Sequence, residues 1–254
     1  MKRSICIIMT VIFCLMVLMP ISVFAETYHL GGTDMSIRVD DSSWYVFTRD
    51  NIKNNSELDE LEISYDSMHD ILYNNEAYMD AILLYDDGEF VELFVRKRIM
   101  DSGIVNLSNY GNEDVLELAK GLAERQNAED YSVYENKYKF AKLEYIDSNL
   151  DYYICEFVTC VNKDNYTFTF QSTSQFSDSE YDEIENIIDS IHFDVDASLK
   201  EPKATSFWDS VVEKAIGGAV IGGIVGAIIA IANKKKKNSN KEEHHFCDDN
   251  ADTE

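Results

Sequence analysis

Basic side chains are scarce in this sequence. Its 254 residues include 22 Lys and Arg against 47 Asp and Glu, which gives a formal net charge of −25 at pH 7. The whole deficit lies between residues 26 and 203, where 14 basic residues are set against 39 acidic ones. Proteins that bind nucleic acids neutralise phosphates with Lys and Arg, so the composition argues against a nucleic-acid partner. Anionic polymers and lipid headgroups would be repelled too, unless divalent cations bridge them. The alternative interpretation of the acidity is a well-solvated surface that resists aggregation.

Cysteine is also sparse in this acidic segment. Two of the five cysteines, Cys155 and Cys160, fall within it, and both lie in the run YYICEFVTCV. This run predicts a β-strand, in which residues five apart are about 17 Å from each other and point to opposite faces. A disulfide needs Cα atoms about 5.5–6 Å apart. We therefore expect two free, buried thiols.

Recognisable catalytic and metal-binding motifs are missing. The sequence has no D-x-D-x-D-G calcium loop, no HExxH, no GxSxG and no glycine-rich phosphate loop. Of the five histidines, His244 and His245 are neighbours, and with Cys247 and Asp248 they lie on a short polar tail where metal binding would be weak. His192 is expected on the exposed face of a strand. We predict no catalytic, cofactor-binding or metal residues, no cofactor and no enzymatic activity.

Proline is rare as well, and one of the two prolines, Pro20, ends an apolar run that begins the chain. The basic pair at positions 2 and 3 precedes this run, and Val23 and Ala25 have the small-residue spacing of a signal-peptidase site. We predict a signal peptide over 1–25, cleaved after Ala25, and export of the segment that follows. The alternative is an uncleaved N-terminal anchor.

A second apolar run lies near the C-terminus. The eighteen residues 215–232 are uncharged and comprise 6 Ile, 2 Val, 5 Ala and 5 Gly. As a helix this run would extend about 27 Å, slightly less than the roughly 30 Å hydrocarbon layer of a bilayer. Each glycine would destabilise a soluble core helix by about 1 kcal/mol relative to alanine, which favours a membrane setting. We predict a juxtamembrane and transmembrane helix over 206–232.

Four lysines follow this helix directly. By the positive-inside rule they place the tail, 233–254, in the cytoplasm and the large N-terminal domain outside the cell membrane. The residues that set this topology are Lys234, Lys235, Lys236 and Lys237.

Small residues recur every four positions in the predicted transmembrane helix, at Gly218, Gly222, Gly226 and Ala230. This spacing places them on one helix face, where a second backbone can approach closely. We expect self-association, or docking to a partner membrane protein, through these residues. The alternative is that small residues are simply common in such segments.

The exported segment alternates between strand and helix patterns. Strands are predicted at 35–39, 44–47, 78–85, 89–98, 138–147, 151–161 and 166–172, and helices at 56–74, with a candidate break at 64–66, and at 112–127. The turn sequence Asp86-Asp87-Gly88 predicts a hairpin between two of these strands. Mostly antiparallel hairpins with helices interposed indicate an α+β fold, in which a mostly antiparallel sheet is sandwiched with helices.

The last helix of this segment has the clearest local signals. In FSDSEYDEIENIIDSI, Ser177 and Glu180 form a capping box, and Phe176 and Tyr181 occupy the hydrophobic-staple positions. Isoleucines at helical spacing, from Ile184 onward, are expected to face the core.

The stretch DNYTFTFQSTSQFSDSEYDEIENIIDSIHF resembles the end of PsbP-like domains, where a strand with alternating aromatic and Thr residues precedes a short loop, a closing helix and a strand. Trp44 after a β-strand and the long meander over 138–170 are similar to that family too. The resemblance covers 35–194 and implies an α/β sandwich used as a non-catalytic binding or assembly module near membranes. It carries over no catalytic residue, because the family has no shared active-site motif, and it leaves the ligand open.

Together these patterns predict one domain organisation. The signal peptide (1–25) is followed by an extracytoplasmic α+β domain (26–194), a linker (195–205), the membrane helix and the cytoplasmic tail. The leading hypothesis is a single-pass, membrane-anchored binding or assembly module. The alternative is an envelope sensing or signalling component whose transmembrane helix self-associates, and an envelope enzyme comes third.

Overall fold

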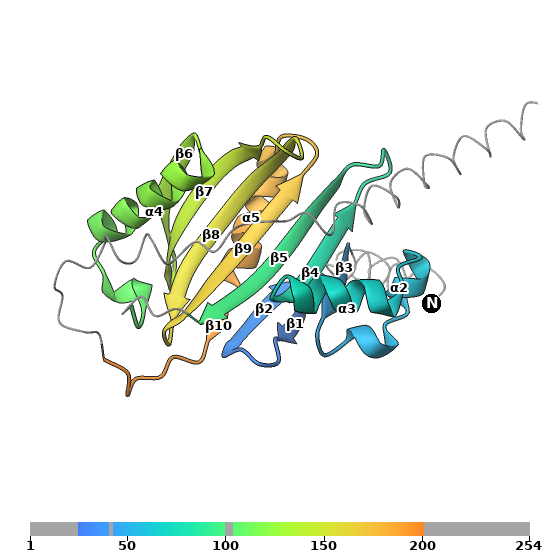
Figure 1. Ribbon diagram of the computed structural model, residues 1–254, viewed down its shortest axis with the longest axis horizontal. Helices are drawn as coiled ribbons and strands as arrows, with labels where there is room; N and C mark the ends of the chain where they lie inside the picture. Colours follow the sequence, from blue (N-terminus) through green and yellow to red (C-terminus); the bar gives the residue numbers. More distant parts are fainter. Residues whose placement is uncertain (1–24, 41–42, 100–103, 201–254) are drawn as a thin grey trace, which may run out of the picture.

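The structure, a computed structural model, describes residues 25–40, 43–99 and 104–200 (Figure 1). Its main strands are β3 (Trp44–Thr48), β4 (Ala77–Leu84), β5 (Phe90–Ile99), β6 (Asp130–Glu135), β7 (Lys139–Asp147), β8 (Tyr152–Val161) and β9 (Asp164–Ser172). They form one antiparallel sheet in the order β3-β4-β5-β9-β8-β7-β6. A second antiparallel sheet contains β1 (Glu26–His29), β2 (Met35–Val39) and β10 (His192–Phe193), with β2 in the middle.

Helices lie on both faces of the large sheet. They are α2 (Glu57–Glu60), α3 (Tyr65–Asn74), α4 (Asn112–Gln126) and α5 (Asp178–Asp189), with 3₁₀ turns η1 (Ile52–Asn54) and η2 (Leu107–Asn109). On one face α3 packs against β4, and α4 packs against β6 and β7 (Figure 1). The opposite face packs against α5 and the small sheet in a separate apolar core. The fold is therefore α+β with antiparallel sheets and a few helices, as predicted.

Both faces of the central strands are apolar, because each strand alternates its side chains between two covered layers. In β5, Val91, Leu93 and Val95 belong to the core shared with α5, whereas Phe90 and Phe94 belong to the core shared with α3 and α4. The shared face predicted for the three β5 residues is confirmed. A strand buried on both sides leaves no solvated position in its middle for a charged side chain.

Several boundaries differ from the sequence prediction. The strands β1 and β6 were not predicted, because both are short, lie at sheet edges and contain no fully buried residue. The helix predicted over 56–74 divides before the expected break, since Glu62 has a positive φ of 55° and Ser64 caps α3 by accepting a hydrogen bond from Ser67 N. The strand β9 begins two residues earlier than predicted, at Asp164.

The local signals of the closing helix are confirmed. Ser177 Oγ accepts from Glu180 N at 3.4 Å, and Ser177 N donates to Glu180 Oε2 at 2.6 Å, which completes the capping box at the start of α5. The rings of Phe176 and Tyr181 lie 5.6 Å apart. The β4–β5 hairpin is confirmed too, and Gly88 adopts the positive φ of 91° that such a turn favours.

The prediction for the two thiols is also confirmed. Cys155 and Cys160 are buried on β8, and neither forms a disulfide. They belong to different cores, Cys155 on the α5 side and Cys160 on the side of α3 and α4. Opposite placement on one strand rules out a bond between them.

Candidate functional site

A cluster of polar side chains lies in the middle of the large sheet, on the face that carries α3 and α4. We call it the polar cluster, and none of its members is more than 9% exposed. Its members are Asp80 of β4, Glu92 and Arg96 of β5, Glu156 of β8, and Thr169 and Gln171 of β9. Strands distant in sequence bring these residues together. The strand pairing places Glu92 opposite Gln171 and Glu156 opposite Thr169.

Two carboxyls form one half of the cluster. Ile82 is the direct partner of Glu92, and Asp80 is the direct partner of Phe94, so Asp80 and Glu92 are diagonal neighbours on one face. Gln171 donates its Nε2 hydrogen to Glu92 Oε2 from the other side. Each carboxyl therefore faces another polar group across a strand pair.

Burial controls the protonation of this pair. Removal from water raises the pKa of Asp80 to about 7. The pKa of Glu92 rises well above its usual range, first through burial and then through the negative charge of Asp80. At neutral pH the two buried acids therefore keep at least one proton between them.

This half of the cluster has more acceptors than donors. Within the described ranges, both carboxylate oxygens of Asp80, Glu92 Oε1, Gln171 Oε1 and Tyr152 Oη are buried without a hydrogen-bond partner from another side chain or the backbone. An unsatisfied buried polar group costs about 1–3 kcal/mol. Such a concentration of unsatisfied atoms is unusual in a folded domain, and calls for an explanation.

The other half of the cluster is mostly paired, although Arg96 Nε is buried without a hydrogen-bond partner. Arg96 Nη2 donates to Thr169 Oγ1 at 3.3 Å and lies 4.0 Å from Glu156 Oε2. Thr169 Oγ1 donates to Glu156 Oε2 at 3.2 Å, so the hydroxyl links the two charges. Burial lowers the pKa of Arg96 and raises the pKa of Glu156, while the opposite charge of each partner acts against these shifts. Arg96 is thus directed to Glu156 and Thr169.

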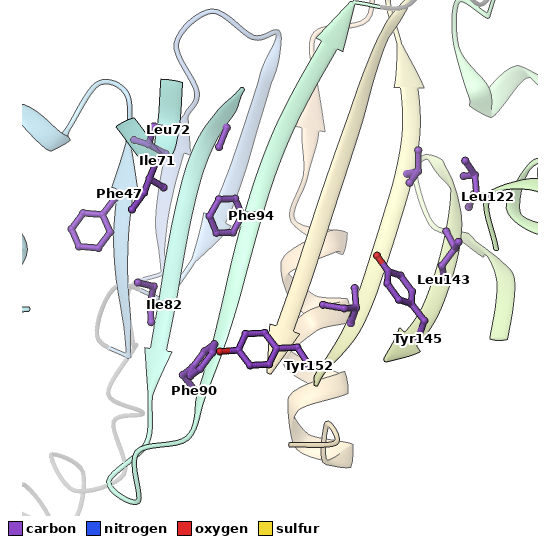
Figure 2. Packing of buried hydrophobic residues seen from close by; sticks show 14 of the residues in the cluster. Phe47, Ile71, Leu72, Ile82, Phe90, Phe94, Leu122, Leu143, Tyr145 and Tyr152 are labelled. Atoms are coloured by element: carbon purple, nitrogen blue, oxygen red, sulfur yellow. The ribbon is translucent and has the colours of Figure 1, made fainter. Parts of the chain in front are cut away.

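Aromatic rings are buried on the same face of the sheet as the polar cluster, and Figure 2 shows Phe90, Tyr145 and Tyr152 among them. Tyr152 of β8 extends toward Phe90 of β5, and their rings meet edge to face with centroids 5.7 Å apart. Burial and the charge of Glu92 raise the pKa of Tyr152. Burial likewise raises the pKa of Tyr145. These apolar walls keep the dielectric low, which is why the charged groups between them are so strongly perturbed.

A second feature lies on the outer surface of α3. Tyr65, His69 and Tyr73 are spaced four residues apart and therefore share one helix face. The ring centroids of Tyr65 and His69 lie 5.7 Å apart, and those of His69 and Tyr73 lie 4.3 Å apart in a stacked arrangement. Tyr65 and Tyr73 remain 44% and 45% exposed. We call the row formed by Tyr65, His69 and Tyr73, together with Tyr78 and Arg49 described below, the aromatic ladder.

An arginine continues the ladder beyond α3. The guanidinium carbon of Arg49 lies 4.6 Å from the ring centroid of Tyr73 and 3.9 Å from that of Tyr78. Two hydrogen bonds hold it there, from Nε to Ala77 O at 2.7 Å and from Nη2 to Leu72 O at 3.1 Å. The ladder thus ends in a cation whose position is set by the backbone.

An open groove of about 470 Å³ lies between β2 and α5, with Arg38, Glu183 and Asp189 in its walls. Its carboxylates already have donors: Glu183 accepts from Trp44 Nε1 at 2.6 Å, and Asp189 accepts from Tyr134 Oη at 2.8 Å. The groove is therefore a weaker candidate site than the polar cluster.

The residues predicted to act in the membrane lie outside the described ranges: Gly218, Gly222, Gly226, Ala230, Lys234, Lys235, Lys236 and Lys237. Among the described helices, none is long and apolar enough to cross a bilayer. The membrane helix, its self-association and the cytoplasmic tail remain predictions.

The remaining sequence expectations concern polar residues. His192 is exposed on β10, as predicted, with Nδ1 2.7 Å from Lys137 Nζ and Nε2 3.5 Å from Asp194. The acidic run at Asp86 and Asp87 is a turn. In the part of the chain that the structure describes, no group of three or more His, Cys, Asp and Glu side chains is placed to hold a metal ion.

Sequence reasoning missed the polar cluster. The available signal was a single acid inside an otherwise apolar strand, as in YMDAILLY, EFVELFVRKR and YYICEFVTC. Because these strands are apolar at both odd and even positions, an acid in their middle has to be buried. That pattern could have marked Asp80, Glu92 and Glu156, but it could not show which of them meet.

No protein-family model matches this chain, and no curated protein sequence matches it significantly. The resemblance to PsbP-like domains therefore remains a prediction from residue pattern.

Proposed function

We propose that the protein is a single-pass, membrane-anchored binding or assembly module that holds a PsbP-like α/β sandwich outside the membrane. The signal-peptide pattern and the C-terminal apolar segment support the location. The aromatic ladder carries the binding role, because it is an exposed, pre-organised surface of the residue types that dominate protein interfaces.

The physical case for the ladder rests on its order. Tyrosine and arginine are enriched where proteins bind each other, since each combines a large contact area with a polar end. His69 stacks on Tyr73 and meets Tyr65 at a tilted angle, and these ring contacts order the row before a partner binds. Arg49 is already held by two backbone carbonyls. Little conformational entropy is then lost on binding, which raises affinity.

A site-specific photo-crosslinker tests this role. It would replace Tyr73 in the full-length protein, expressed in its own membrane, and adducts would be identified by mass spectrometry. A matched control is Leu116, which is 43% exposed on α4 and lies outside the ladder. We expect a discrete adduct from position 73 and none from position 116. The same adduct pattern at both positions, or no adduct from 73, would contradict the binding role of the ladder.

Paired substitutions separate binding from folding. Tyr65→Ser with Tyr73→Ser should abolish association with the crosslinked partner and change the melting temperature little, because both rings are substantially solvated. Leu116→Ser serves as the control and should leave association intact.

The alternative is an envelope sensing component whose transmembrane helix self-associates, and the four-residue repeat of small residues favours it. Gly222→Ile should separate two associated helices, because a branched side chain prevents backbone approach, whereas Ile221→Leu should have little effect. A membrane-association reporter fused to residues 205–237 measures both variants. Equal signals from wild type and Gly222→Ile would leave the helix as a plain anchor.

A further inference from the structure

Five oxygen atoms in or beside one half of the polar cluster are buried and unsatisfied. They come from four neighbouring strands of the sheet: two from Asp80 on β4 and one each from Glu92 on β5, Gln171 on β9 and Tyr152 on β8. Two of the four side chains, Gln171 and Tyr152, are uncharged, so the unsatisfied atoms are not confined to the acids. Gln171 is fully buried and Tyr152 nearly so.

We infer that Asp80, Glu92, Gln171 and Tyr152 form a binding site for a hard divalent cation, with Ca²⁺ the ion that suits these ligands best. Carboxylate oxygens, an amide carbonyl and a hydroxyl are all hard oxygen donors. Ca²⁺ takes 6–8 oxygen ligands in flexible geometry, and a carboxylate can bind it through both oxygens, as the two unsatisfied atoms of Asp80 permit. Mg²⁺ demands near-ideal octahedral geometry and usually keeps several waters, so a buried site suits it less.

The charges of the site agree with this assignment. Fully ionised, Asp80 and Glu92 would place two negative charges in an apolar surrounding. The nearest described cation on this face, Arg96, donates to Thr169 and pairs with Glu156 instead. A shared proton neutralises one of the two charges, and a divalent ion neutralises both. A proton also satisfies fewer oxygens than a metal ion, and leaves the carbonyl of Gln171 without a donor.

The ligand set also explains why the site has no sequence motif. Two of its four members are not among the residue types that mark metal clusters, and all four come from different strands. Glu92 and Gln171 are separated by 79 positions in the chain. Register across β4, β5, β9 and β8 assembles the site, so no short run of sequence contains it. The inference is independent of the proposed function, since it concerns a different surface.

The test uses full-length protein in detergent, treated with a chelator and then titrated with CaCl₂ at pH 8 by calorimetry. We expect one tight equivalent of Ca²⁺ and an increase in melting temperature on saturation. Affinity should fall as the pH is lowered, because protons compete for Asp80 and Glu92. The other buried titratable groups on this face are Arg96, Glu156, Tyr145, Tyr152 and Cys160. Calorimetry of Glu156→Gln checks that the pH effect comes from the pair.

Terbium luminescence gives a local readout. Tb³⁺ replaces Ca²⁺ in oxygen-rich sites and emits when a nearby tyrosine is excited, so Tyr152 should sensitise it. Tyr152→Phe should remove most of this emission and weaken Ca²⁺ binding about tenfold, the scale on which loss of a supporting ligand acts. Because Phe keeps the ring that packs on Phe90, this variant should fold.

A matched pair of charge changes decides the case. Asp80→Asn with Glu92→Gln should abolish the tight equivalent, whereas Asp86→Asn with Asp87→Asn, in the exposed β4–β5 turn, should leave it unchanged. The inference is overturned if the wild type binds no Ca²⁺, or if the buried pair can be neutralised without loss of binding. A wild type that ignores Ca²⁺, together with a neutralised pair that is more stable at pH 8, would identify a carboxyl pair that holds a proton only.

Discussion

The two faces of the large sheet carry very different side chains, although the same strands form both faces. On the face toward α5, four phenylalanines stack edge to face in the middle of the sheet, with adjacent centroids 6.1–6.3 Å apart. They are Phe140, Phe157, Phe168 and Phe170. On the other face the same strands present Glu156, Thr169 and Gln171. Adjacent residues of β8 or β9 therefore point to opposite faces, one into the aromatic core and the next into the polar cluster.

This contrast separates stability from function. Edge-to-face aromatic packing stabilises a domain and needs no partner. Buried acids and an arginine cost desolvation, and hydrophobic residues of similar volume would often be as stable or more stable. The α5 face therefore explains why the domain folds, and the opposite face holds groups that folding alone does not require.

The largest expected effect comes from the aromatic face. Phe168→Ala should lower the free energy of unfolding by about 3–5 kcal/mol, because it removes a fully buried ring that its neighbours cannot replace. Chemical denaturation of the variant measures this loss. Phe168→Leu, which keeps most of the apolar volume, should cost clearly less. A loss below about 1 kcal/mol for Phe168→Ala would mean that this face is loosely packed.

A comparable loss is expected when the buried ion pair is broken on the polar face. Glu156→Leu alone should cost about 3 kcal/mol, because it leaves the Arg96 guanidinium buried without its counter-charge. Adding Arg96→Met should restore most of the lost stability, since the charge is then removed altogether. Urea denaturation of both variants tests this pair. Additive losses in the double variant would show that the two charges act independently.

The carboxyl pair should make stability depend on pH. The folded state raises the pKa of Asp80 to about 7 and the pKa of Glu92 further, so it keeps protons that the unfolded chain has already released. Without added metal, the stability from this pair is complete below about pH 4 and is lost as the pH rises through 7. We expect the free energy of unfolding to be at least about 2 kcal/mol lower at pH 8 than at pH 5, because the raised pKa of Asp80 alone accounts for that much.

Neutral variants isolate this contribution. Asp80→Asn with Glu92→Gln should remove most of the decline between pH 5 and pH 8, measured by denaturation at each pH in the presence of a chelator. Asp87→Asn in the exposed turn should retain the decline. A wild-type curve that rises over this interval would contradict the raised pKa values.

The smallest effect concerns the cap of the helix that covers the aromatic face. Ser177→Ala should lower the free energy of unfolding by about 1 kcal/mol, because Glu180 N loses its side-chain acceptor. Glu180→Gln should cost less, since glutamine also serves in a capping box. Thermal denaturation compares the two variants, and equal losses would show that the charge of Glu180 matters more than the cap.

Local patterns predicted most of the framework. The capping box at Ser177, the staple of Phe176 on Tyr181 and the turn at Gly88 all depend on residues within five positions of each other. The opposite facing of Cys155 and Cys160 follows from strand geometry alone. By contrast, β6 was missed, because this edge strand is covered on one side by α4 and lacks the long apolar run of a central strand.

The sequence by itself determined the alternation of each strand, the caps and turns, the acidic charge and the two apolar segments that predict export and anchoring. Those properties depend on neighbours in the chain. The tertiary structure alone decided that Asp80, Glu92 and Gln171 meet, that Arg96 is directed to Glu156, and that Arg49 ends the row of rings on α3. Such contacts depend on strand order and register, which are set by the packing of the whole sheet between two layers rather than by any short run of residues.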